Sequence, residues 1–342
     1  MTDTSAEPSL GSSAIADRLA AALPADVDYA SARLVDERTE HLTVLRHHLE
    51  PIHNDVDTGV MVSVWDGGGL GSAATADLSD AGLRRAVDRA RHWAHVTAGK
   101  MVTDGVAGAA IAPPSDHPTG TYRSPVEISW ETIPLADRLD LLHRQSRLLG
   151  IDGRIVDWAA SLAIRRVDSL LVTVGRDGGR GRIEQRFDFA YPRLRATANE
   201  DVNTQTRTFG GNAFCGQGGA EVLDRFGFDD AATLVANEAL ELLSAPNCPD
   251  GVMDVVLAPD QMILQIHESI GHPLELDRIL GDERNYAGTS FVTPDMFGTF
   301  RYGSELLDVT FDPTVPGQLA SYGFDDDGSP ATREYLIKGG IL

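Results

Sequence analysis

The chain has 342 residues, 42% of them apolar, and this length exceeds what one hydrophobic core usually serves. Fifty-one acidic residues outnumber 29 basic ones and give a net charge of −22, so the chain would repel nucleic-acid phosphates and anionic lipid surfaces. We therefore expect two domains, no nucleic-acid partner and no membrane partner.

The N-terminus and the cysteines indicate the cellular compartment. Residues 1–13 are polar and acidic, without the basic and apolar regions of a secretion signal, and no later stretch approaches the ~18 continuous apolar residues of a membrane span. Cys215 and Cys248 form no CxxC pair, and a chain of this length needs no disulfide. These features predict a soluble, cytoplasmic protein.

The first hundred residues predict mixed α and β structure. Apolar spacing and turn residues mark, in chain order, a short helix at 15–23, a hairpin of strands 27–35 and 42–46 that turns at 38–40, strands at 60–65 and up to residue 76 joined by a glycine turn at 66–71, and a long amphipathic helix capped by Ser79.

A connector rich in Gly, Ala and Pro at about 106–125 leads to the second segment. The elements expected there are a helix at 135–149, strands at 155–164, 170–174, 182–189 and 193–198 in an antiparallel sheet, a helix at 231–243, a buried strand at 252–257, and a helix that starts at Pro259. We divide the chain into a disordered tail (1–12), an α/β domain in two segments (13–220) and a second domain (221–342).

The helix that starts at Pro259 carries an HExxxH pattern, His267-Glu268-Ser-Ile-Gly-His272. The second histidine comes five residues after the first, whereas the common HExxH motif of zinc peptidases has a spacing of four. On an ideal α-helix, residues five apart point about 140° away from each other, so two such side chains could not reach one metal without a local distortion.

The residues after Glu268 offer two ways to produce this distortion. Gly271 can adopt the left-handed conformation that ends a helix, and Pro273 favours an extended conformation at His272, which would then fold back from just beyond the helix. A single π-turn is the alternative.

The chemistry of these residue types suits a hydrolytic zinc site. Zinc binds two neutral imidazoles with a third protein ligand and a water, whose pKa falls to about 7. Glu268, adjacent to the first ligand, could take the proton of that water and pass it to a leaving amine. The structural alternative is that both histidines only end a buried helix.

Other candidate residues have simpler interpretations. Glu275 and Asp277 could orient the imidazoles, although a solvated acidic face also explains Asp277. We interpret Cys215 as a small loop residue and not a nucleophile, because no histidine is indicated beside it. The remaining candidates are expected to be solvated edge histidines (His47, His48 and His53), helix-end histidines (His92 and His95), a hairpin turn (66–71) and an exposed acidic turn (325–327).

The HExxxH segment, followed by Glu275 and Asp277, resembles the signature of the TldD subunit in the TldD/TldE (PmbA) peptidase family. Residues 59–68 and 71–79 with the helix that follows resemble the first domain of that family, and residues 334–342 resemble its inner hairpin. The likeness spans nearly the whole chain.

The resemblance implies an α+β protein: a two-layer N-terminal α/β domain with an antiparallel sheet, followed by the start of a β-rich metallopeptidase domain. It implies zinc at His267 and His272, Glu268 as the catalytic base, unfolded peptides or leader peptides as substrates, and a homodimer or a heterodimer with a TldE/PmbA-like subunit. A non-catalytic partner or fragment that keeps the fold and dimer surface is the alternative.

The family pattern also implies a third zinc ligand, a cysteine in a C-terminal glycine-rich segment that this sequence does not contain. Neither Cys215 nor Cys248 matches that position. We therefore expect a C-terminally truncated chain that ends in half a hairpin and leaves one strand unpaired. With one protein ligand missing, it should bind zinc weakly or not at all.

Overall fold

The computed structural model describes residues 13–101, 114 and 116–342. The tail at 1–12 and most of the first half of the expected connector lie outside the described residues. The elements up to the middle of the chain are α1 (Ser13–Ala22), β1 (Tyr29–Leu45), β2 (His48–Leu49), β3 (His53–Asp66), β4 (Gly69–Thr75), α2 (Asp80–Thr97), β5 (Thr119–Arg123), a 3-10 turn (Trp130–Thr132) and α3 (Leu135–Leu149).

The second half begins with the two longest strands. Its elements are β6 (Ile155–Gly175), β7 (Arg180–Glu200), β8 (Asn203–Phe209), β9 (Gly216–Gln217), α4 (Glu221–Arg225), α5 (Phe228–Leu242), α6 (Pro259–Ile266), a π-helical turn (His267–Gly271), α7 (Leu276–Leu280), α8 (Arg284–Ala287), β10 (Val309–Phe311) and β11 (Glu334–Ile337); further 3-10 turns are Gly211–Ala213, His272–Leu274 and Pro294–Met296.

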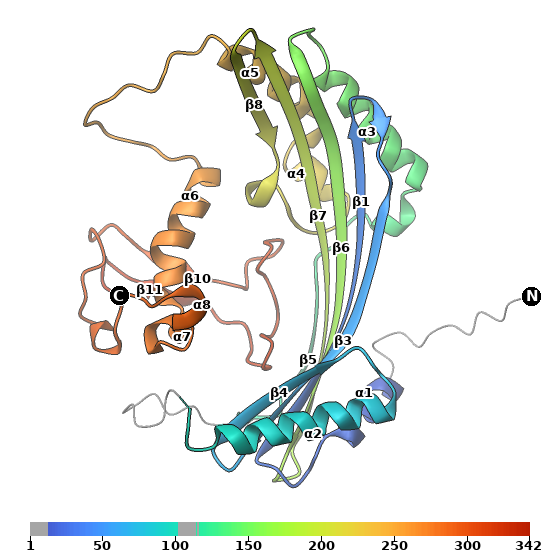
Figure 1. Ribbon diagram of the computed structural model, residues 1–342, viewed down its shortest axis with the longest axis vertical. Helices are drawn as coiled ribbons and strands as arrows, with labels where there is room; N and C mark the ends of the chain where they lie inside the picture. The colour runs from blue at the N-terminus through green and yellow to red at the C-terminus, as the bar shows by residue number, and fades with distance from the viewer. Residues whose placement is uncertain (1–12, 102–113, 115) are drawn as a thin grey trace, which may run out of the picture.

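Nine of the described strands form one curved sheet (Figure 1). Its main path runs β4-β3-β1-β6-β7-β5, with β2 on β1 and with β8 and β9 on β7. All pairs are antiparallel except β5 with β7. The expected α+β class with an antiparallel sheet is confirmed.

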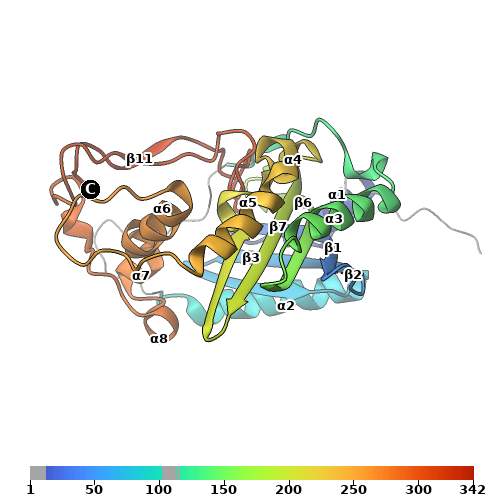
Figure 2. The same cartoon turned by 90° about the horizontal axis from the view of Figure 1, so that it is seen from above.

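One face of this sheet carries two separate hydrophobic cores. Because side chains alternate along a strand, Leu34 and Leu42 of β1 point to the same face. Leu34 belongs to a core with α1 and α2, and Leu42 to a second core with α3 and α5. The helices therefore cover the two ends of one face, and the opposite, concave face turns toward α6 and the segments that follow it (Figures 1 and 2).

Between the two cores the covered face is charged and not apolar. Glu40 pairs with Arg138, and Arg166 pairs with Asp188 at 2.8 Å. Arg186 similarly pairs with Asp168 on the neighbouring strand at 2.6 Å. This charged region between the two cores explains one wrong prediction. β1 runs unbroken through residues 38–40, where a hairpin turn was expected.

Three other sequence predictions are also corrected. The four expected strands between 155 and 198 are two long ones, β6 and β7, and β5 lies within the expected connector. The apolar run Val252–Leu257 is exposed coil instead of a buried strand, with Val252 and Val256 almost fully accessible. The predicted helices at 15–23, 135–149 and 231–243 and the helix capped by Ser79 are confirmed to within a few residues.

The segment after α6 has a small core of its own. Ile270, Val292, Ile337 and Leu342 are buried together there. β11 pairs with β10, so the expectation of an unpaired strand in this last segment is wrong.

The division into domains stays a prediction. α5 packs into the core beneath β6 and β7, so its contacts connect it to the large sheet and not to the segment that contains Ile270.

Within the described part of the chain, no helix has both the length and the apolar content needed to cross a bilayer.

Candidate metal centre

The α6 helix starts as the sequence predicts. Pro259 occupies its first turn, where a missing backbone N–H costs nothing, and Asp260 lies near the positive helix end. The regular helix stops at Ile266, one residue before the first histidine of the HExxxH pattern.

A π-turn then brings the two histidines of this pattern together. The backbone N–H of His272 donates to the carbonyl of His267, an i to i+5 bond that stacks residues five apart on one side of the helix. Of the two distortions considered, the π-turn is the one observed. Gly271 and His272 both have right-handed helical dihedrals, so the left-handed glycine and the extended histidine were wrong expectations.

Apolar packing and a side-chain hydrogen bond hold the π-turn. Ile270 is buried in the small core beside Val292 and Ile337. A π-turn disturbs the regular backbone hydrogen bonds of a helix. The carbonyl of Ser269, which lies within this turn, accepts a hydrogen bond of 2.5 Å from the hydroxyl of Tyr302. Packing and this hydrogen bond fix the distorted turn.

The two imidazoles and the glutamate between them form a compact group of possible metal ligands. The rings of His267 and His272 have their centres 4.1 Å apart at an interplanar angle of 69°. One ligand atom from each of His267, Glu268 and His272 lies within 4.8 Å of the other two. The side chain of His267 is 55% exposed and that of His272 30%, so the group opens to solvent on one side.

This donor set fits a zinc ion, because imidazole nitrogens and carboxylate oxygens are its usual protein ligands together with thiolates. The structure shows that the two imidazole rings lie side by side. The assignment of His267 and His272 as ligands, and of Glu268 as the base, stays a prediction.

Glu275 and Arg278 hold the ring of His272. Glu275 Oε1 lies 2.8 Å from Nδ1 of His272, and its other oxygen forms an ion pair with Arg278. With the proton on Nδ1, the ring donates to Glu275 and keeps the lone pair of Nε2 free. The hydrogen bond from His272, with the pairing to Arg278, lowers the pKa of Glu275 below its usual range.

The sequence predicted a role for Glu275 but missed Arg278. The spacing of three residues from Glu275 on a helix was the available signal for that ion pair. Asp277 is exposed, as a solvated acidic face would have it, and its carboxylate accepts a hydrogen bond from the backbone N–H of Arg278.

The other candidates lie elsewhere. Cys215 is buried, which raises the pKa of its thiol to about 11, and Cys248 is exposed on the chain before α6. His47 packs edge-on against Trp158 with ring centres 5.0 Å apart, while His53 is exposed at the start of β3. The glycine turn at 66–71 is confirmed as the turn between β3 and β4.

We expect Glu275→Gln to weaken zinc binding by about 10–100-fold, because an amide does not hold the Nδ1 proton of His272 as strongly as a carboxylate. Competition with a chromophoric chelator measures the affinity. Glu275→Asp should restore part of it, and Glu305→Gln, an exposed glutamate outside the site, is the matched control. Equal zinc affinity in Glu275→Gln and Glu305→Gln would show that Glu275 has no positioning role.

Two family models match parts of this chain. The family model described as the PmbA/TldA metallopeptidase C-terminal domain matches residues 250–342, and that described as PmbA/TldA metallopeptidase domain 1 matches residues 30–94. The first match contains the whole HExxxH segment.

Similar proteins match most of the chain. "Metalloprotease MJ0996" of Methanocaldococcus jannaschii is 24% identical over 330 residues, 92% of this chain and 65% of that protein. "Metalloprotease TldD homolog" of Haemophilus influenzae is 27% identical over 300 residues, 84% of this chain and 56% of that protein. The chain thus spans less than two thirds of the length of these relatives.

The fold also matches solved structures. TldE from Thermococcus kodakarensis superposes with a TM-score of 0.58 at 15% identity, over 96% of this chain and 67% of that one. At this identity the likeness is evidence for the fold alone.

Proposed function

Because this chain belongs to the PmbA/TldD metallopeptidase family, we propose that it is a zinc-dependent endopeptidase subunit that hydrolyses unfolded peptides or leader peptides. The observation that supports this most is the π-turn, which places two imidazoles five residues apart on one side of the helix with a carboxylate beside them.

In this proposal His267 and His272 hold the zinc through imidazole nitrogens, and Glu275 keeps the lone pair of His272 Nε2 available. When bound, zinc supplies Lewis-acid chemistry, which polarises a peptide carbonyl and makes water acidic enough to attack near neutral pH.

Glu268 has the remaining role. Its side chain is 61% exposed and makes no side-chain hydrogen bond to the described residues, so its carboxylate is free to accept a proton from water and return it to the leaving amine nitrogen. The exposure of these side chains leaves room for an extended peptide beside them.

We further propose that the chain works as a homodimer or with a TldE/PmbA-like subunit. The family and the fold shared with TldE support this pairing.

The test of the proposed activity is metal-dependent cleavage of an unstructured peptide by the purified chain. We expect cleavage when zinc is supplied in excess, loss of cleavage after treatment with a chelator, and recovery when zinc is added back. Mass spectrometry of the products identifies the bond that is cut. Cleavage that survives complete removal of metal, or no cleavage by a chain with stoichiometric zinc, would contradict the proposal.

A further inference from the structure

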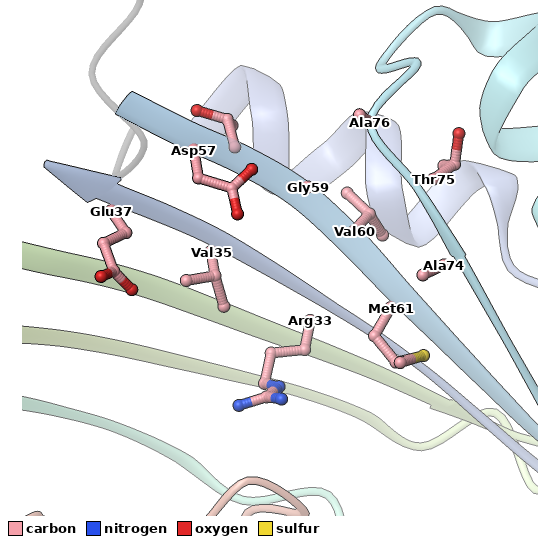
Figure 3. A pocket seen from close by; sticks show the side chains of 11 residues that line it. Arg33, Val35, Glu37, Asp57, Gly59, Val60, Met61, Ala74, Thr75 and Ala76 are labelled. Atoms are coloured by element: carbon pink, nitrogen blue, oxygen red, sulfur yellow. The ribbon is translucent and has the colours of Figure 1, made fainter. Parts of the chain in front are cut away.

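The concave face of the large sheet, opposite the face that carries the two cores, has a groove. One part, of about 650 Å³, lies over β1, β6 and β7 and is walled by residues 319–327. A second part, of about 410 Å³, lies over β3 and β4. Both parts are lined by Arg33, Val35 and Glu37 of β1, which Figure 3 shows in a row along that strand, so the two form one groove across the sheet.

The wall of this groove is fixed to the sheet by two buried glutamines. Gln185 donates to the carbonyl of Phe324 at 2.8 Å and accepts hydrogen bonds from two backbone N–H groups of the wall. Gln217, fully buried, donates to the carbonyl of Ser321 at 2.6 Å. These hydrogen bonds fix the wall of the groove in place, so the groove is not merely a gap beside a loose loop.

One row of residues across the strands gives the groove two chemically different ends. Asp57 on β3 lies opposite Glu37 on β1, and Val167 on β6 lies opposite Phe187 on β7. Glu37 and Val167 are also direct neighbours, so the row runs from two acids to an aromatic ring. Phe189 and Tyr191 continue the aromatic end, with rings stacked along β7.

At the acidic end of the groove, only one of the two carboxylates is paired with a cation of the described residues. Like charges directly opposite each other destabilise a sheet, yet Asp57 and Glu37 occupy such a pair. Arg165 binds Glu37 through two hydrogen bonds of 2.6 and 2.7 Å, whereas Asp57 makes no ion pair to any described residue. Over the whole lining, five carboxylates stand against two arginines.

We propose that this groove binds an extended peptide segment that has a lysine or arginine four residues from an aromatic side chain. The basic group would lie between Asp57 and Glu37, and the aromatic one against Phe187. This proposal rests on the proposed function, in which unfolded peptides are the substrates of the chain.

The dimensions of the sheet support that spacing. With strands about 4.8 Å apart, Phe187 on β7 lies about 10 Å from β1 and about 14 Å from β3. In an extended peptide, residues four apart point to the same side and are separated by about 13 Å. A basic and an aromatic side chain at this spacing reach both ends of the row.

Binding is measured by fluorescence anisotropy in the Glu268→Gln background, so that the peptide is not consumed. The probe is a labelled nine-residue Gly/Ser peptide with lysine at its third and phenylalanine at its seventh position. Comparison peptides carry glutamate in place of the lysine, or serine in place of the phenylalanine. We expect the parent groove to prefer the lysine–phenylalanine peptide over each of them.

Asp57→Lys should weaken binding of the lysine–phenylalanine peptide about fivefold and strengthen binding of the glutamate peptide. The new lysine would face Glu37, which replaces a like-charge pair with an opposite one, so the Tm should not fall. The matched control is Asp88→Lys on α2, an exposed aspartate with the same change of charge, which should alter either affinity less than twofold. Phe187→Ala should reduce the advantage of phenylalanine over serine in the peptide.

Equal effects of Asp57→Lys and Asp88→Lys would show that only the net charge matters, and would overturn the groove assignment. Equal affinity for the lysine and glutamate peptides would overturn it as well. Both results are independent of turnover, so they leave the proposed peptidase activity intact; conversely, absent cleavage by the parent chain would leave the binding result intact.

Discussion

Glu268→Gln is expected to lower the rate of peptide cleavage by about 10²–10⁴-fold while the chain keeps its zinc. Glutamine has nearly the shape of glutamate but cannot accept a proton from water, and general base catalysis contributes a factor of this size. The imidazoles of His267 and His272 are unchanged by the substitution, so the metal stays bound. The measurement is metal content and turnover on one unstructured peptide, made on the same protein sample.

Two results would contradict this assignment in different ways. If zinc is lost together with activity, Glu268 is a ligand, which its position within 4.8 Å of both imidazoles allows. If activity stays within a few-fold of the parent, another carboxylate is the base, with Glu275 the first candidate. Glu305→Gln, outside the site, provides the control for the loss of one negative charge.

The sequence predicted which residues of the site meet, but only in part how they meet. The spacing of His267 and His272 requires a distortion, and the two available solutions could not be separated from local sequence. The π-turn is stabilised by contacts from residues 20 to 75 positions further along: Val292, Tyr302, Ile337 and Leu342. Those contacts depend on tertiary packing, which the spacing of a motif does not reveal.

The sheet was predicted in kind but not in the length of its strands. The run from Arg38 to Glu40 suggested a turn because consecutive polar residues without apolar periodicity are typical of loops. The structure shows another cause for these charges. β1 crosses the charged region between the two cores, where ion pairs such as Glu40 with Arg138 replace apolar contacts. Only the pairing of strands far apart in sequence makes such a segment a strand.

The opposite error occurred at residues 252–257. An apolar run of this length is typical of a buried strand, yet a strand needs a neighbour for its backbone hydrogen bonds. None of the described residues pairs with it, and its valines remain exposed. The acidic end of the groove was equally hidden in the sequence, because Glu37 and Asp57 become neighbours only through the register of β1 and β3.

His267→Ala and His272→Ala should each remove zinc binding, because two imidazoles are the core of the proposed ligand set and the loss of either leaves one. Zinc at 1,000 times its dissociation constant would stabilise the parent chain by about 4.1 kcal/mol. For a chain of this size that corresponds to a rise in Tm of roughly 5 °C. Neither variant should show this rise.

Thermal unfolding with and without zinc, together with metal analysis after dialysis, measures the effect of these two substitutions. His267 is more than half exposed, so without metal its replacement should change stability by no more than about 0.5 kcal/mol, and a missing zinc response then reports ligand loss and not misfolding. The control is His95→Ala, an exposed histidine on α2, which should keep the full response. A zinc-dependent rise in Tm that persists in both site variants would place the metal elsewhere in the chain, and the π-turn would then need another explanation than ligand geometry.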